Sequence, residues 1–118
     1  MSPVTRHADL AAGRWQTLTL AEQLAHVGSE VERAIRAWDR GRSDRFEHAL
    51  GRALELFALT VRDERWRGPR RREILRTREE FLTLFFDDAP PAGSARGLTK
   101  YFLQFAVLAR RGAGGGNR

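Results

Sequence analysis

The feature that most constrains the fold is the stretch FEHALGRALELFALTV, from Phe46 to Val61. On a helix this stretch places most of its apolar side chains on one broad face, which covers about half of the circumference. Leu59 falls on the opposite, polar face with Glu47 and His48. A helix of this kind needs apolar partners on more than one side. We therefore expect it to lie at the centre of a helical domain, with Leu54 in the core.

Three further stretches have helical apolar spacing. The first begins at Thr19, which has the capping-box spacing to Glu22, and ends at Gly41. Ser43 is the expected N-cap of the central helix. A third helix is expected over about residues 70–86 and a fourth after Ser94, with Leu108 on its inner face. Short connections and the lack of a strand signal predict an all-α fold, an antiparallel up-down-up-down four-helix bundle.

The 118 residues suit one domain. We expect an irregular N-terminal arm over 1–17, with Leu10 and Trp15 as anchors, the four-helix bundle over 18–111, and a flexible Gly-rich tail over 112–118. No apolar run approaches the roughly 18 residues of a membrane span. Cysteine is absent, which excludes disulfides and thiolate metal sites. A cytoplasmic location without membrane contact is the expectation.

Several blocks together resemble an uncharacterised family of small prokaryotic four-helix-bundle proteins: GRWQTLTLAEQL, GSEVERAI, FEHALGRALELFALT, EILRTREEFL and KYFLQFAVLAR. The resemblance spans roughly Gly13 to Arg110 and implies a single intact domain, but no catalytic residues. In size, charge and topology the chain is also similar to two groups of helical bundles. One is the accessory variability determinant of diversity-generating retroelements, a basic oligomer that assists a reverse transcriptase. The other is the HEPN class of RNases and nucleotidyltransferase partners.

The catalytic patterns in the sequence are weak. HEPN ribonucleases use an Arg and a His a few residues apart, and Arg42 and His48 have that spacing. His48, however, falls on the polar face of the central helix, and such a pair arises easily by chance in a chain so rich in Arg. His26, with Glu22 and Glu30 one turn away on either side, also lies outside the apolar stripe of its helix. We therefore expect no enzyme, no metal site and no cofactor.

The strongest signal for binding is the Arg62–Arg78 stretch. It holds eight Arg against three acids and so supplies +5 of the net charge of +6. Arg side chains pair with phosphates, and an exposed Trp66 could stack on an unpaired base. The predicted nucleic-acid-binding residues, for RNA or DNA, are Arg62, Arg65, Trp66, Arg67, Arg70, Arg71, Arg72 and Arg76. A solvated loop whose Trp66 closes the end of the bundle is the structural alternative.

A second signal is apolar surface outside the four core stripes. Leu59, Phe86, Leu103 and Val107 are predicted to point away from the core, which favours a homo-oligomer interface. Arg78, by contrast, falls on an apolar stripe. We expect it to be buried and paired with Glu30, or else with Glu47.

These patterns predict a non-enzymatic, basic, oligomeric helical bundle. In this interpretation it is an accessory that binds nucleic acid, a nucleic-acid-handling enzyme such as a reverse transcriptase, or both. The alternatives are a HEPN-like partner of a nucleotidyltransferase, with or without RNase activity, and a structural oligomer without a ligand.

Overall fold

The structure, a computed structural model, describes residues 13–115 and the side chains of residues 13–112. Within this range the chain forms four α-helices and no strand: α2 (Leu20–Asp39), α3 (Ser43–Val61), α4 (Pro69–Phe86) and α5 (Ser94–Gly115). Two short 3-10 helices, η2 (Trp15–Thr17) and η3 (Glu64–Trp66), precede α2 and α4. The all-α prediction is confirmed over the described residues. Most of the arm predicted over 1–17, including Leu10, lies outside them.

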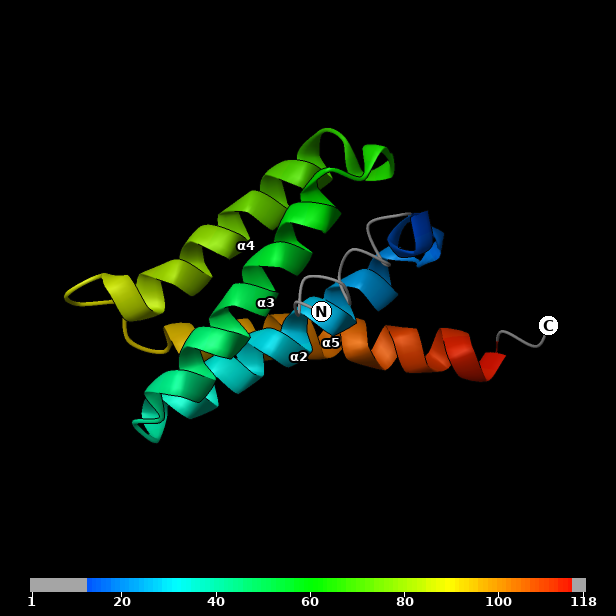
Figure 1. Cartoon of the computed structure of the whole chain (residues 1–118). Coiled ribbons are helices and arrows are strands. Elements are labelled where there is room, and N and C mark those ends of the chain that lie inside the picture. Colours follow the sequence, from blue (N-terminus) through cyan, green and yellow to red (C-terminus); the bar gives the residue numbers. More distant parts are fainter. Residues whose placement is uncertain (1–12, 116–118) are drawn as a thin grey trace.

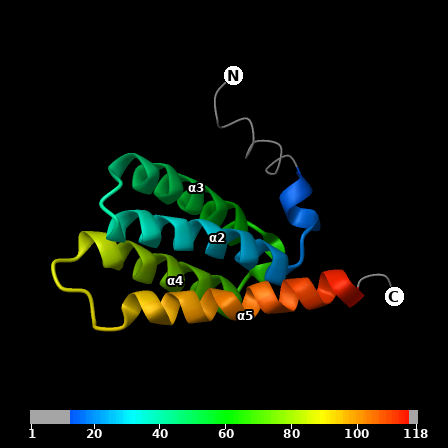
Figure 2. The same cartoon turned by 90° about the horizontal axis from the view of Figure 1, so that it is seen from below.

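The four helices lie alongside one another (Figures 1 and 2). The most extensive helix contacts are those of α2 with α3 and with α5, while α4 touches α3 and α5. This closed set of contacts is compatible with a four-helix bundle. The last turns of α5 extend beyond the other helices (Figure 2). That helix continues to Gly115, past the end expected at residue 111.

The ends of the helices follow local chemistry. Thr19 and Glu22 form the predicted capping box at α2, with the Thr19 amide 2.8 Å from the Glu22 carboxylate and the Glu22 amide 3.1 Å from the Thr19 hydroxyl. Gly41, with φ of 66°, turns the chain between α2 and α3. Ser43 is the first residue of α3 and not its cap. The N-cap is Arg42, whose side chain makes no capping hydrogen bond.

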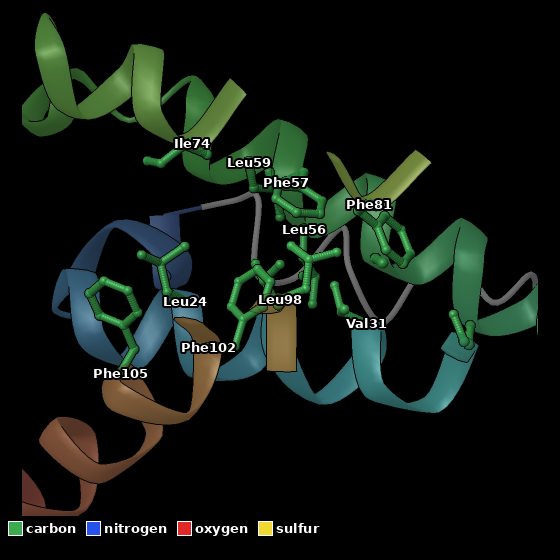
Figure 3. Close-up of a cluster of buried hydrophobic side chains, with 14 of the residues drawn as sticks. Leu24, Val31, Leu56, Phe57, Leu59, Ile74, Phe81, Leu98, Phe102 and Phe105 are labelled. Carbon is green, nitrogen blue, oxygen red and sulfur yellow. The ribbon is translucent and has the colours of Figure 1, made fainter. Parts of the chain in front are cut away.

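The core is built around three aromatic rings from different helices. Phe57 of α3 lies 6.0 Å from Phe81 of α4 and 6.3 Å from Phe102 of α5, measured between ring centroids (Figure 3). Leu24, Val27 and other buried residues of α2 close the core. No helix within the described residues is long and apolar enough to cross a membrane.

The expectations for Leu59 and Leu108 are wrong, and that for Leu54 holds only in part. Leu59 is only 6% exposed, because α3 packs against α4 and η3 as well as α2, and Leu59 lies on the side of α3 that faces Ile74 (Figure 3). The buried face of α3 is thus wider than predicted, and Leu54 is half-buried at its margin, where it packs against the core. Leu108 is 48% exposed; it lies in the C-terminal part of α5, which runs to Gly115.

Candidate nucleic-acid interface

The Arg62–Arg78 stretch begins directly after α3 and covers the helix η3 and the first half of α4. Five of its eight Arg lie beside a carboxylate: Arg65 beside Asp63, Arg67 and Arg71 beside Glu64, Arg70 beside Glu73, and Arg78 beside Glu79. Arg62, Arg72 and Arg76 are exposed and have no carboxylate partner among the described residues. Four carboxylates, Asp63, Glu64, Glu73 and Glu79, therefore offset half of the eight positive charges predicted to meet phosphates.

Trp66 and Arg65 take part in a hydrogen-bond network around the buried Gln23. The Trp66 indole donates to the Gln23 side-chain oxygen at 2.8 Å, and the Gln23 amide nitrogen donates to the Trp15 carbonyl and to Asp63, each at 2.9 Å. Arg65 donates to both Asp63 oxygens, at 3.0 and 2.7 Å, and to the Leu18 carbonyl at 2.8 Å. The network fastens η2 and η3 to α2, so these side chains brace the end of the domain.

The same network holds Asp63 as a carboxylate. Asp63 is 3% exposed, and the hydrogen bond from the Arg65 guanidinium lowers its pKa from the ordinary value of 3.8 to about 2, against the opposing effect of burial. The Arg65 guanidinium also lies 4.5 Å from the centre of the Trp66 ring and covers one face of it. Trp66 is half-buried, and this arrangement favours its structural role over base stacking.

Arg78 departs from prediction. Its guanidinium pairs with Glu79 at 3.1 Å, and its side chain is 36% exposed. Glu30, the predicted partner, instead binds Arg33 and Arg52, at 3.1 and 3.2 Å. The sequence pattern predicts a buried Arg78 on the apolar stripe of α4. The neighbouring Thr77, which is 6% exposed, is the buried residue instead. Its hydroxyl donates to the Glu73 carbonyl at 2.9 Å, so the buried hydroxyl of Thr77 is paired.

A second basic region, which we call the hairpin pocket, lies where the end of α2 meets the start of α3 (lower left in Figure 1). It is an open hollow of about 460 Å³ with a small floor of Ala37 and Ala49. Asp44 and His48 also line it. Its rim carries six arginines, two from α2, two from the connection and two from α3: Arg33, Arg36, Arg40, Arg42, Arg45 and Arg52.

The hairpin pocket keeps an excess of positive charge. Glu30 neutralises one charge of the Arg33 and Arg52 pair, and Glu32 lies 3.4 Å from Arg36. With Asp44 as the lining acid, six Arg less these three carboxylates leave +3 with His48 neutral. Arg40, Arg42 and Arg45 make no ion pair within residues 13–112. Three guanidinium groups are thus free to bind an anion.

His48 is tied to the same arginine cluster. An Arg52 guanidinium nitrogen lies 3.2 Å from His48 Nδ1. Since Arg can only donate, Nδ1 accepts, and in the neutral ring the proton lies on Nε2. The structure therefore brings Arg42 and His48, the pair noted in the sequence, to one hollow. Sequence reasoning missed the pocket because its Arg are dispersed. The signal was the polar face that Arg33, Arg36 and Arg40 share, followed directly by a tight turn.

The predicted interface residues differ in exposure. Phe86 is 65% and Leu103 54% exposed, Val107 is half-buried, and Leu59 belongs to the core. His26 is exposed, and its ring lies 5.8 Å from that of Trp15. No group of three metal-binding side chains occurs in the described part of the chain.

Comparison of the chain with protein-family models, curated proteins and solved structures gives no match.

Proposed function

We propose that the protein is a non-enzymatic, basic helical-bundle accessory that binds the phosphate backbone of nucleic acid through the hairpin pocket. The observation that carries this proposal is the convergence of six Arg on one hollow, three of them without a carboxylate partner among the described residues. This is a change from the Arg62–Arg78 stretch favoured by the sequence, where five of the eight Arg lie beside a carboxylate.

A chain of phosphates fits the hairpin pocket better than a single carboxylate does, because it presents several anionic groups to several Arg. The guanidinium fork pairs with two phosphate oxygens at once, and charge-assisted hydrogen bonds of this kind are stronger than neutral ones. The hollow is open to solvent, and its arginines come from two helices. A chain of phosphates can therefore lie along it and meet several Arg in turn, and each contact releases counterions into solution.

A fluorescence-anisotropy titration with labelled oligonucleotides, at low and at physiological salt, tests the proposal. We expect tight binding at low salt that weakens steeply as salt rises. Absence of binding at low salt, where electrostatic attraction is strongest, would rule the proposal out. A mass-matched neutral polymer is the control for nonspecific adsorption.

The accessory role concerns partners as well as ligands. We propose that the helices run antiparallel in an up-down-up-down order, and that α5 presents Leu103 and Val107 to a second copy of the chain. The short connection between α2 and α3 and the exposure of Leu103 support these two points. A nucleic-acid-handling enzyme such as a reverse transcriptase is the proposed partner. The cytoplasmic location stays a prediction.

A HEPN-like role is the second candidate, favoured by one observation. Arg42 and His48 line the same hollow, so both could act on one phosphodiester. In this case His48→Ala should abolish cleavage of a single-stranded RNA while Arg40→Gln weakens only its binding. RNA that stays intact after prolonged incubation with the wild-type protein would exclude RNase activity. A structural oligomer without a ligand is the remaining alternative, and the anisotropy titration also tests it.

A further inference from the structure

Trp38 is an exposed aromatic ring beside the hairpin pocket. It is 48% exposed near the end of α2, and its ring centre lies 4.9 Å from that of Phe46 and 5.2 Å from that of Phe85. These two buried rings support one side of the indole. An indole held in this way but open to solvent on another side can accept a further ring with little loss of its own freedom.

A second hollow, of about 370 Å³, lies next to Trp38. It shares Ala37 and Arg42 with the hairpin pocket, so the two hollows adjoin. Their linings differ in chemistry. The hairpin pocket is dominated by arginines, whereas the second hollow offers the Trp38 and Phe46 rings, the Ser43 hydroxyl and the Glu47 carboxylate.

This division matches the two parts of a nucleotide. Phosphate needs cations, which the hairpin pocket provides. A nucleobase is flat and neutral, and it stacks on aromatic side chains. Its N–H groups can donate hydrogen bonds to a carboxylate. A carboxylate in the second hollow would repel phosphate but suits a base. Arg42, which lines both hollows, marks the border between the two.

We infer that this end of the molecule binds a single-stranded nucleic acid, with its phosphates in the hairpin pocket and an unpaired base stacked on Trp38. The inference rests on the proposed function and names its substrate class. Base faces are covered by their neighbours in a duplex, and only unpaired nucleotides offer them to a side chain. The protein should therefore prefer single strands to duplexes of equal charge.

Substitution of Trp38 provides the test. Trp38→Leu keeps an apolar side chain but removes the ring, and we expect it to weaken single-strand binding by about 5- to 150-fold, the range for loss of one stacked base. Duplex binding should stay within about twofold, since it depends on phosphate contacts. Trp38→Phe, which keeps a ring against Phe46 and Phe85, should retain most of the single-strand affinity. The Tm of each variant shows that the comparison is made on folded protein.

A measurement on the wild-type protein complements the variants. Stacking should quench the fluorescence of Trp38 when a single-stranded oligonucleotide binds, while a duplex or polyglutamate should not. Loss of the quenching in Trp38→Phe would assign the signal to Trp38, because Trp15 and Trp66 remain.

The outcomes separate this inference from the proposed function. If single strands and duplexes bind equally and Trp38→Leu weakens both alike or neither, the single-strand inference is wrong while phosphate binding stands. Displacement of the oligonucleotide by polyglutamate at equal charge would mean that an acidic protein segment is the ligand, which overturns the inference. If no oligonucleotide binds at low salt, both proposals fail.

Discussion

Gly28 of α2 lies directly against Phe102 of α5. A Cβ atom built on Gly28 would come within 2.6 Å of the Phe102 Cβ, a distance that real Cβ atoms essentially never show. The atom approached belongs to the stem of a buried side chain that cannot swing away, since Phe102 is 4% exposed. The close packing of α2 and α5 therefore requires glycine at this position.

This contact predicts opposite effects for one substitution at two glycines. Gly28→Ala should lower the free energy of unfolding by about 1 kcal/mol or more, because overpacking outweighs the gain in helix propensity. Gly51→Ala is the matched control, since a Cβ at Gly51 of α3 meets nothing within 4 Å. It should raise stability by up to about 1 kcal/mol. Urea denaturation measures both, and equal stabilisation by the two variants would contradict the packing.

The core predicts a second pair of effects. Phe57 is fully buried, so Phe57→Ala should cost about 3–5 kcal/mol of stability. Leu54→Ala should cost distinctly less, because Leu54 is half-buried at the margin of the α3 face. Chemical denaturation of the two variants checks this order. A greater loss for Leu54→Ala would show that Leu54 lies deeper in the core than Phe57, which would contradict the structure.

Asp63 predicts a pH dependence. Because its pKa is lowered from 3.8 to about 2 in the folded protein, the carboxylate stabilises the fold fully above pH 3.8. That contribution, on the order of 2 kcal/mol, is lost as the pH falls through 2. Asp63→Asn should be less stable than the wild type at neutral pH. The difference in their free energies of unfolding should become smaller between pH 4 and 2. A difference in stability that stays constant with pH would show that the hydrogen bond from Arg65 does not lower the pKa of Asp63.

The surface of α5 predicts self-association. Leu103 is 54% exposed, and Val107 follows it one turn later. Light scattering should detect a species larger than the 13.4 kDa chain, and Leu103→Glu combined with Val107→Glu should dissociate it, since charge is poorly tolerated in an apolar contact. A monomer at high protein concentration would contradict the predicted interface.

Sequence patterning was sufficient for the helices and most of their inner faces. Leu98, Phe102 and Phe105 of the fourth predicted helix are buried at helical spacing, and the capping box at Thr19 forms. Apolar periodicity reports which face of a helix is buried, but it does not report how many neighbours cover that helix. For this reason Leu59 was placed outside the core, although α4 and η3 pack beside α3.

The candidate site was harder to predict, because charge in a sequence does not show which acids lie nearby in space. The contiguous Arg of the Arg62–Arg78 stretch fold against Asp63, Glu64 and Glu73. The dispersed Arg of α2 and α3 converge only once the turn at Gly41 brings the two helices together. Spatial convergence of this kind depends on tertiary packing and not on local sequence density.

The central claim is that binding resides in the hairpin pocket, and two triple variants with the same change of charge test it most directly. One replaces Arg40, Arg42 and Arg45 by Gln. The control replaces Arg62, Arg72 and Arg76, which are likewise exposed and without a carboxylate partner in the part of the chain that the structure describes.

The measurement is the affinity of each triple variant for a single-stranded oligonucleotide across a series of salt concentrations. The pocket variant should lose affinity, and its slope of log K against log salt should become shallower by about 2, roughly 0.7 for each lost phosphate contact. The control variant should bind nearly as the wild type does. An equal loss in both variants, or a loss in the control alone, would contradict a binding site in the hairpin pocket.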